Sequence, residues 1–353
     1  MDSPGWFRAT KVSNMPALFP IFVPQGKSKT RYRVGYIDHH GEVVIDPVFK
    51  EGTLYAEGTA SVQVTGGRWG VIDTNGSFVI QPELWNWCRF KDGLAPLATK
   101  AGKWGVIDKS GNFVVQPVYD SIGPFENGRA LVRTGEGREA RFGFIDQAGA
   151  EVIPLNFQKA RHFSEGLAAV KVGHLWGYIL PSGVFQITPR FDGTGNAKRY
   201  PDIRAGAFVD GLAPVWAGQD YYRFIDMQGS FGFESGFDDA NSFSEGRAVV
   251  KQGNHFGYID NDGRTVIACR YTLARNFSEG LARIEEEESR SGFSPPTGFI
   301  DREGNIVIPP RFYSANDFAN GLSLVSTGDS IGYINKSGEF VWQGAFVDCG
   351  VVF

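Results

Sequence analysis

Apolar residues recur in short runs along this chain, and each run ends at a tight turn. The run Trp104–Asp108 is typical, because it is followed by Lys109 and Ser110 and then by Gly111. Runs of this length that alternate apolar with small or polar residues predict short, half-buried β-strands. An aspartate that opens a turn can accept backbone hydrogen bonds, and a glycine that closes it takes a left-handed conformation at little steric cost. Apolar residues resume after the glycine, so the pattern predicts a β-hairpin.

This hairpin recurs throughout the chain with a period of about 35 residues. Taking the residue after the strand's first aromatic as the origin of a unit, the successive intervals are 35, 35, 38, 34, 46, 34, 41 and 34 residues. The nine origins are Gly35, Gly70, Gly105, Gly143, Gly177, Arg223, Gly257, Gly298 and Gly332. A fixed period indicates that one small unit was copied, and that the fold is an array of these units.

A third element follows each hairpin and has a glycine, then a small residue, then an aliphatic one at alternate positions. The small residues are Ala60, Ala95, Ala130, Ala168, Ala213, Ala248, Ala282 and Ser323. A spacing of two places the small and aliphatic residues on one buried face of a strand. Pro96 and Pro214 lie within this strand and have no N–H group to donate, which predicts that one side of the strand is an unpaired edge.

The fold that we predict is therefore all-β, a tandem array of about nine β-meander or hairpin repeats. A fourth short strand is expected near the aromatic residue that follows the hairpin. One unit cannot bury its own aromatic residues, so neighbouring units must stack. We favour an open β-superhelix or solenoid, because 35 residues are few for a four-stranded blade; the alternative is a closed β-propeller. Residues 1–30 are predicted to be an N-terminal segment or cap, and residues 31–350 a single repeat array.

Composition restricts the functional classes. The chain has 353 residues, 14% aromatic residues, 46 glycines, three cysteines and a formal net charge of -4. This charge argues against nucleic-acid and membrane surfaces, and the three cysteines share no metal-ligand spacing. The apolar stretch from Met15 to Pro24 contains three prolines, which oppose the helix of a signal peptide. We expect a cytoplasmic protein that binds neither nucleic acid nor membrane.

The repeated residues resemble the WG-repeat family, also called KWG repeats, over roughly residues 31 to 350. The match is carried by the run Gly102–Gly111, by Pro117–Asp120 and by the Phe-Ser-Glu-Gly-Leu-Ala run Phe163–Ala168. The unit at Arg223 departs most, since arginine stands in place of glycine. The resemblance implies a bacterial, non-enzymatic all-β repeat protein used for binding, in a family that includes candidate immunity proteins beside toxins. It transfers no catalytic site.

The repeated polar and aromatic residues are better explained by structure than by chemistry. The aspartates stand where a turn needs them, and no unit supplies the cluster of oxygen ligands that Ca²⁺ requires. No nucleophile and base are paired by the repeat, so we expect no enzyme activity, no cofactor and no metal. The repeated tryptophans fit a packing position better than a carbohydrate-binding ladder.

Candidate binding residues lie where the repeat is violated. One insertion, near residues 193–206, contains Arg199 and Tyr200, and a second, near 283–296, contains Glu285, Glu286, Glu287 and Glu288. Insertions in repeat arrays form loops on one face, which is often the binding face. A third irregularity places Trp85 and Trp87 where other units have polar or small residues.

These observations predict a non-catalytic scaffold that presents a repeat surface to a protein partner. A specific form of this hypothesis is an immunity protein that neutralises a bacterial toxin through its acidic loop. The alternative is a carbohydrate or cell-wall binding module that uses exposed aromatic residues.

Overall fold

The computed structural model describes residues 17–26, 30–192, 205–218, 221–286 and 296–346. They form β-strands and one short 3-10 helix, η1 (Gly137–Glu139). The prediction of an all-β repeat array is confirmed. In the part of the chain that the structure describes, no helix has the length and the apolar character needed to cross a membrane.

The strands form a series of sheets, each built from consecutive strands. The first four sheets are β1 (Phe19–Pro24), β2 (Tyr32–Ile37) and β3 (Val43–Phe49); β4 (Glu51–Gly52), β5 (Thr59–Gln63), β6 (Trp69–Asp73) and β7 (Phe78–Leu84); β8 (Leu94–Ala98), β9 (Trp104–Asp108) and β10 (Phe113–Tyr119); and β11 (Ser121–Glu126), β12 (Arg129–Thr134), β13 (Arg141–Asp146) and β14 (Glu151–Phe157).

The remaining sheets continue in the same order, and one of them is only a two-stranded ribbon. They are β15 (Lys159–Ala160), β16 (Ala168–Val172), β17 (Leu175–Ile179) and β18 (Phe185–Asp192); the ribbon β19 (Ala213–Trp216) and β20 (Tyr222–Ile225); β21 (Asp239–Ala240), β22 (Ala248–Gln252), β23 (His255–Ile259) and β24 (Thr265–Tyr271); β25 (Leu273–Ala274), β26 (Ala282–Glu285), β27 (Thr297–Ile300) and β28 (Ile306–Phe312); and β29 (Ser314–Ala315), β30 (Ser323–Ser326), β31 (Ser330–Ile334) and β32 (Phe340–Ala345).

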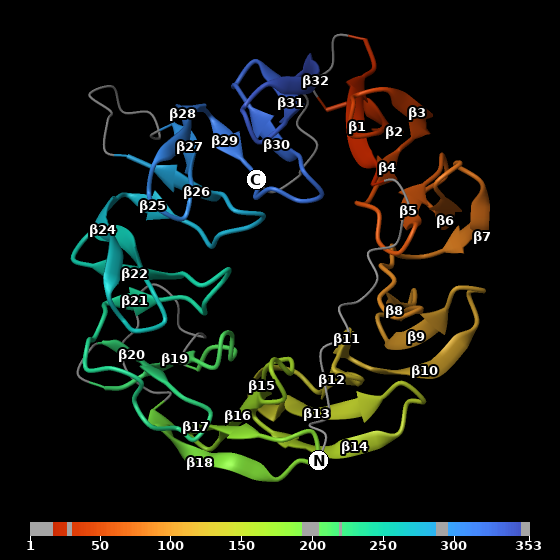
Figure 1. Ribbon diagram of the computed structural model, residues 1–353. Coiled ribbons are helices and arrows are strands. Elements are labelled where there is room, and N and C mark those ends of the chain that lie inside the picture. The colour runs from red at the N-terminus through yellow and green to blue at the C-terminus, as the bar shows by residue number, and fades with distance from the viewer. Residues whose placement is uncertain (1–16, 27–29, 193–204, 219–220, 287–295, 347–353) are drawn as a thin grey trace, which may run out of the picture.

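The sheets stand around a ring, so the protein is a closed β-propeller (Figure 1). The predicted open β-superhelix is therefore wrong. The physical reason lies in the inner strands, which are as short as the two residues of β4, Glu51–Gly52. With an inner strand this short, a four-stranded sheet fits into a unit of about 35 residues.

The ring is closed by the same contacts that join neighbouring sheets elsewhere. Inside the array, the ring of Tyr258 lies 4.9 Å from that of Phe277 in the next unit, and its hydroxyl donates to the Arg275 carbonyl at 2.8 Å. At the junction of the first and last sheets, the ring of Tyr333 lies 5.3 Å from that of Phe19, and its hydroxyl donates to the Pro20 carbonyl at 3.0 Å. One hydrophobic core spans both sheets, so the junction is an ordinary inter-sheet interface.

The N-terminal part of the chain contributes directly to this closure. The sequence predicts an N-terminal segment or cap at residues 1–30, and within this range β1 pairs antiparallel with β2 from Phe19 to Pro24. Phe19 pairs with Ile37, which is the register position that Ala60 occupies opposite Ile72 in the next sheet. Because Phe19 is large, its ring fills the space against Tyr333.

The sheets that lack a short inner strand carry a proline in the strand that would pair with it. In the second sheet β4 lies inside β5, and the Thr53 N–H donates to the Ser61 carbonyl at 2.9 Å. Among the described residues, the sheets that begin with β1, β8 and β19 have no such strand, and they carry Pro20, Pro96 and Pro214 at the position of Ser61. A proline cannot donate a hydrogen bond to an inner neighbour. Among the described residues, the predicted unpaired edge is found at Pro96, whereas the Pro214 carbonyl accepts from the Gly206 N–H at 2.7 Å and Ala205 forms an isolated bridge with Val215.

The origin glycine of each unit allows the outer strand to approach. A Cβ atom on Gly177 would lie only 2.6 Å from the Ile187 carbonyl oxygen, because the outer strand bulges over this point. Arg223 has a Cβ atom at the corresponding position. Its sheet has only the strands β19 and β20. Phe231 and Phe237 form isolated bridges with residues of β20. The unit that departs most in sequence is therefore also the least regular sheet.

A second tight turn connects neighbouring units. In it, two consecutive residues take positive φ angles, as Glu245 (54°) and Gly246 (75°) do. In regular units the Ser-Glu pair before the glycine reaches the next sheet. The Ser244 hydroxyl donates to the Phe277 carbonyl at 2.7 Å, and the Glu245 carboxylate accepts from the Gly280 N–H at 2.8 Å. We refer to this pair of contacts as the Ser-Glu clamp.

Candidate functional site

The irregular patch Trp85–Cys88 precedes β8 and is fastened to the neighbouring sheet. Cys88 is buried, its N–H donates to the Ser61 hydroxyl oxygen at 3.0 Å, and that hydroxyl donates back to the Cys88 carbonyl at 2.6 Å. Burial raises the pKa of the Cys88 thiol. With the loop held at this point, Trp87 remains 52% exposed.

Beside Trp87 lies a groove of about 670 Å³, which we call the Trp87 groove. Its apolar wall combines Trp87, Phe90 and Trp104 with Ile122 and Pro124 of the next sheet. Pro96 also lines the groove, and its sheet is one of those without a short inner strand. The groove therefore opens where the backbone pairing of the repeat is interrupted.

Most charged groups around the Trp87 groove are already paired within the protein. The Glu57 carboxylate accepts from the N–H groups of Asp92 at 2.5 Å and Gly93 at 3.0 Å, and it lies 3.3 Å from the Lys109 ammonium. Burial alone would raise the pKa of Glu57, but these three partners outweigh burial and lower it.

The neighbouring contact replaces the Ser-Glu clamp. Lys91 and Glu126 occupy the position that is Ser244 in a regular unit, and their charged groups form an ion pair at 2.5 Å. Arg89 is different, because it is exposed and forms no ion pair with any residue that the structure describes. Arg89 also borders a smaller cavity of about 290 Å³ at the ring junction.

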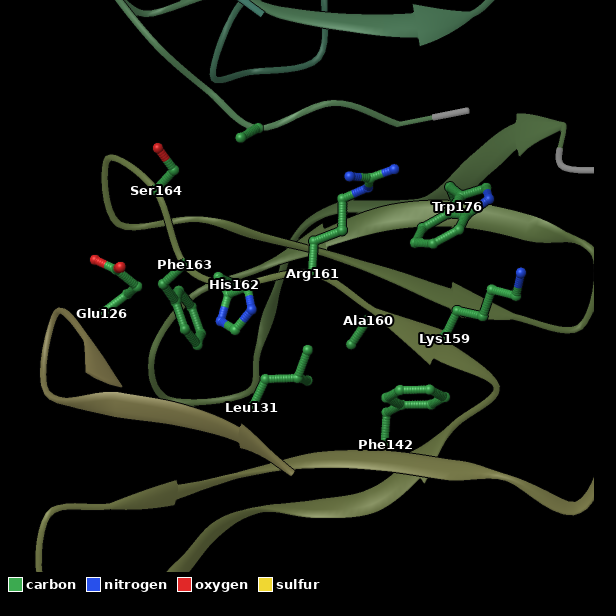
Figure 2. Close-up of a pocket in the computed structure, with 11 residues that line it drawn as sticks. Glu126, Leu131, Phe142, Lys159, Ala160, Arg161, His162, Phe163, Ser164 and Trp176 are labelled. Atoms are coloured by element: carbon green, nitrogen blue, oxygen red, sulfur yellow. The ribbon is translucent and has the colours of Figure 1, made fainter. Parts of the chain in front are cut away.

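A second cavity, of about 690 Å³, lies on the other side of Glu126; we call it the His162 pocket. Figure 2 shows Arg161, His162 and Trp176 around this cavity, with Leu131 and Phe142 on its opposite side. Burial lowers the pKa of His162, which favours the neutral imidazole. Glu126 lines both cavities, so the Trp87 groove and the His162 pocket adjoin at this side chain.

The His162 ring is placed by a close approach between two sheets. It packs against the backbone of Gly123 in β11, where any Cβ atom would collide with the imidazole. The Ser164 hydroxyl, two residues further on, donates to the Phe208 carbonyl at 2.7 Å. That hydroxyl is therefore the serine contact of the Ser-Glu clamp between this unit and the next.

The sequence-predicted binding residues do not come together in one place. Trp87 lines the groove, whereas Trp85 is 46% exposed and lies outside it, with the Arg68 guanidinium 3.4 Å and the Lys100 ammonium 4.6 Å from its ring centroid. Arg199, Tyr200, Glu287 and Glu288 lie outside the described residues.

The two remaining acidic candidates lie at the end of β26. Glu285 pairs in register with Leu273 and Thr297, and its carboxylate accepts a hydrogen bond from the Thr297 hydroxyl at 3.4 Å. Burial raises the pKa of Glu285. Glu285 is thus part of the sheet, and Glu286 follows it as a half-buried residue.

The repeated residues serve the scaffold, as predicted. The Asp38 carboxylate accepts from the N–H groups of His40 at 2.8 Å and Glu42 at 3.0 Å, and Gly41 closes the turn with a φ of 87°. Trp69 and Trp176 are buried at 6% and 3% exposure, so they do not form an exposed ladder. Within the described ranges, no group of three or more His, Cys, Asp or Glu side chains could hold a metal ion.

Sequence reasoning missed most of the residues around the two cavities. Arg89, Lys159, Arg161 and His162 occupy variable positions and carry no motif. A usable signal did exist in the substitution of Ser by Lys91 and Glu126 just before the second turn. Opposite charges in two successive units indicate a changed contact between neighbouring sheets.

Fold and cavities together define a closed all-β propeller of repeated units with clefts between its sheets. The chain belongs to the WG-containing repeat family, whose repeat matches more than half of it. The matched ranges are residues 35–67, 69–98, 104–136, 142–176, 222–254, 256–288 and 298–329. The family predicted from the sequence is confirmed, and the unit at Arg223 is among the matches.

Comparison with other proteins adds little beyond the family. No curated protein sequence matches the chain significantly. The computationally designed Ika8 protein is 12% identical with a TM-score of 0.46, covering 80% of this chain and 92% of its own. BamB from Moraxella catarrhalis is 11% identical with a TM-score of 0.39, covering 92% and 95%. A europium-containing methanol dehydrogenase is 14% identical with a TM-score of 0.40, covering 83% and 77%. Similarity at this level carries no argument about function.

Proposed function

We propose that this protein is a non-catalytic scaffold that binds a protein partner. The observation that carries the proposal is the Trp87 groove, where an exposed tryptophan stands beside an apolar cleft at a break in the repeat. Exposed tryptophans next to well-packed pockets are frequent energetic centres of protein interfaces. The rigid ring of sheets holds such a surface in a defined shape.

The residues around the cavities support a role without catalysis. The Ser164 hydroxyl is engaged by the Phe208 carbonyl, and the Glu57 carboxylate is engaged by two backbone N–H groups and Lys109. A nucleophile or general base must instead be free to reach a reacting atom. These polar groups serve to join neighbouring sheets.

The specific partner that the family resemblance favours is a bacterial toxin, which would make the protein an immunity protein. Co-expression with the product of an adjacent toxin gene tests this directly. We expect growth to be restored by the full chain and the two purified proteins to form a complex of fixed stoichiometry. If no adjacent toxin gene exists, or if the two proteins do not associate, this specific form is excluded.

A general test of the binding function uses the tagged full chain as bait in a lysate of its source cells. We expect one protein to be retained in stoichiometric amounts and to bind again when both proteins are purified. Failure to recover any such protein under native conditions would argue against the proposal.

A carbohydrate-binding module is the second candidate, and the observation that favours it is the exposure of Trp85 and Trp87 at 46% and 52%. Sugar rings stack on exposed aromatic faces. Pull-down on insoluble polysaccharides distinguishes the two functions, because retention by cell-wall material without any protein partner would support this candidate.

A further inference from the structure

We propose that the Trp87 groove docks an acidic polypeptide segment that carries one bulky apolar side chain. The proposal rests on the proposed protein-binding function and specifies the chemistry of the partner. The apolar side chain enters the Trp87 groove, and a neighbouring carboxylate meets Arg89.

Among the described residues of the Trp87 groove, one positive charge has no ion-pair partner. Two basic side chains, Arg89 and Lys91, and two acidic ones, Glu57 and Glu126, line the groove. Lys91 pairs with Glu126, and the Glu57 carboxylate lies 3.3 Å from the Lys109 ammonium. The remaining charge, on Arg89, attracts acidic segments and repels basic ones.

The two acidic groups of the lining are already engaged inside the protein. Glu57 accepts from the Asp92–Gly93 turn, and Glu126 is paired with Lys91. Arg89 has no such partner among the described residues, and it projects from the loop that also carries Trp87. A guanidinium binds carboxylates with two parallel hydrogen bonds, so an acidic side chain is the natural ligand for Arg89.

The Trp87 groove is suited to an apolar side chain rather than to a further charge. The buried side chains of Phe90 and Ile122 line it together with Trp87 and Trp104. Burying an apolar side chain there removes it and the face of Trp87 from water together. The neighbouring Arg89 fixes the direction from which the carboxylate must approach.

Binding of three labelled synthetic peptides to the full chain, followed by fluorescence anisotropy, tests the inference. The first alternates Asp and Glu around a central Trp, the second has Ala in place of that Trp, and the third has Lys in place of every acidic residue. We expect the first peptide to bind at least about tenfold more tightly than the other two. We also expect its affinity to fall as salt is raised from about 0.05 M to about 0.5 M.

Paired variants locate the binding. Trp87→Ala and Arg89→Glu should each weaken the binding of the first peptide about tenfold or more. The first variant removes the apolar contact and the second removes the charge contact. Trp85→Ala is the matched control, because Trp85 is similarly exposed but lies outside the groove, against Arg68 and Lys100. All three positions are exposed, so unchanged thermal melting is expected and verifies that each variant is folded.

Several outcomes overturn the inference. Equal binding of all three peptides does so, as does undiminished binding by the double variant Trp87→Ala, Arg89→Glu or a loss confined to Trp85→Ala. The proposed function is judged separately. If a native protein partner is still bound by that double variant, the scaffold function stands and this docking surface is wrong. Peptide binding that follows the predicted pattern without any native partner supports this surface and leaves the scaffold function refuted.

Discussion

In two arcs of the ring, neighbouring sheets are joined by different contacts. In the regular arc, from β21 to β30, the Ser-Glu clamp and an aromatic pair such as Tyr258 and Phe277 join each sheet to the next. In the irregular arc, from β8 to β11, the Lys91–Glu126 ion pair takes the place of the serine contact, and the sheet that contains Pro96 has no short inner strand. As a consequence, the irregular arc opens into the Trp87 groove.

The difference shows that the repeat can give up backbone pairing locally without losing the ring. Its aromatic core continues through the irregular arc, since Phe90 and Phe125 are 3% and 1% exposed. What changes is the inner rim, where the Lys91–Glu126 ion pair replaces the serine contact and an exposed tryptophan and an exposed arginine stand beside it. We therefore expect the regular residues to determine stability and the irregular ones to determine binding.

The largest expected effect separates the two arcs by stability. Phe277→Ala removes a ring that is 2% exposed, so it should lower the free energy of unfolding by about 3–5 kcal/mol. Trp87→Ala should change it by no more than about 0.5 kcal/mol, because the side chain is half exposed. Chemical denaturation of the two variants makes the comparison. Similar losses would mean that Trp87 belongs to the core.

A second prediction asks whether the ring junction behaves as a regular interface. Gly41 and Gly76 close equivalent turns, with φ angles of 87° and 82°. A Cβ atom at Gly76 would meet only the Ile45 side chain, at 3.5 Å, whereas one at Gly41 would collide with the Val341 carbonyl oxygen across the junction.

Alanine at either position should therefore cost about 1–2 kcal/mol for the left-handed backbone. Gly41→Ala should cost more than Gly76→Ala, because a backbone oxygen cannot move aside as a side chain can. Thermal unfolding and limited proteolysis near β1 measure the difference. Equal losses would show that the first and last sheets are not held together in solution.

The smallest effect is expected from pH and concerns the Glu57 contact between two turns. The pKa of Glu57 is lowered in the folded protein from its ordinary value of 4.5. A carboxyl group with a lowered folded pKa contributes stability above the unfolded pKa, and this contribution is lost as pH falls through the folded value. Stability of the wild-type protein should thus fall below about pH 4.5.

Glu57→Gln keeps an acceptor oxygen but removes the titrating charge. We expect this variant to be slightly less stable than the wild type at neutral pH and to lose less stability on acidification. Urea denaturation at a series of pH values provides the measurement. If both proteins lose stability in parallel, the turn contact does not depend on the Glu57 charge.

Much of the scaffold follows from local sequence. The Asp38–Gly41 turn needs a carboxylate and a left-handed residue, and both requirements concern neighbours in the chain. Pro96 and Pro214 each remove a backbone donor, and the unpaired edge predicted from them is found at Pro96 but not at Pro214, where Ala205 bridges Val215. Arg223 likewise marks an irregular sheet, because it stands where the other units have glycine.

The candidate site could be predicted only in part. Trp87 stands out because it violates the repeat, but Trp85 stands out equally and lies outside the groove. Arg89, Lys91 and Glu126 become relevant only when neighbouring sheets lie side by side. Their roles depend on which charged side chains form ion pairs between sheets. The spacing of residues within one unit does not predict such ion pairs between units.

The sequence by itself determined the all-β class, the repeating unit of about 35 residues and the turns that define it, because these depend on residues close together in the chain. Only the tertiary structure decided that the array closes, since closure requires the small rotations between successive sheets to add up to one full turn. The contact between Phe19 and Tyr333 forms where the first and last sheets meet. The Trp87 groove likewise depends on the packing of three neighbouring sheets.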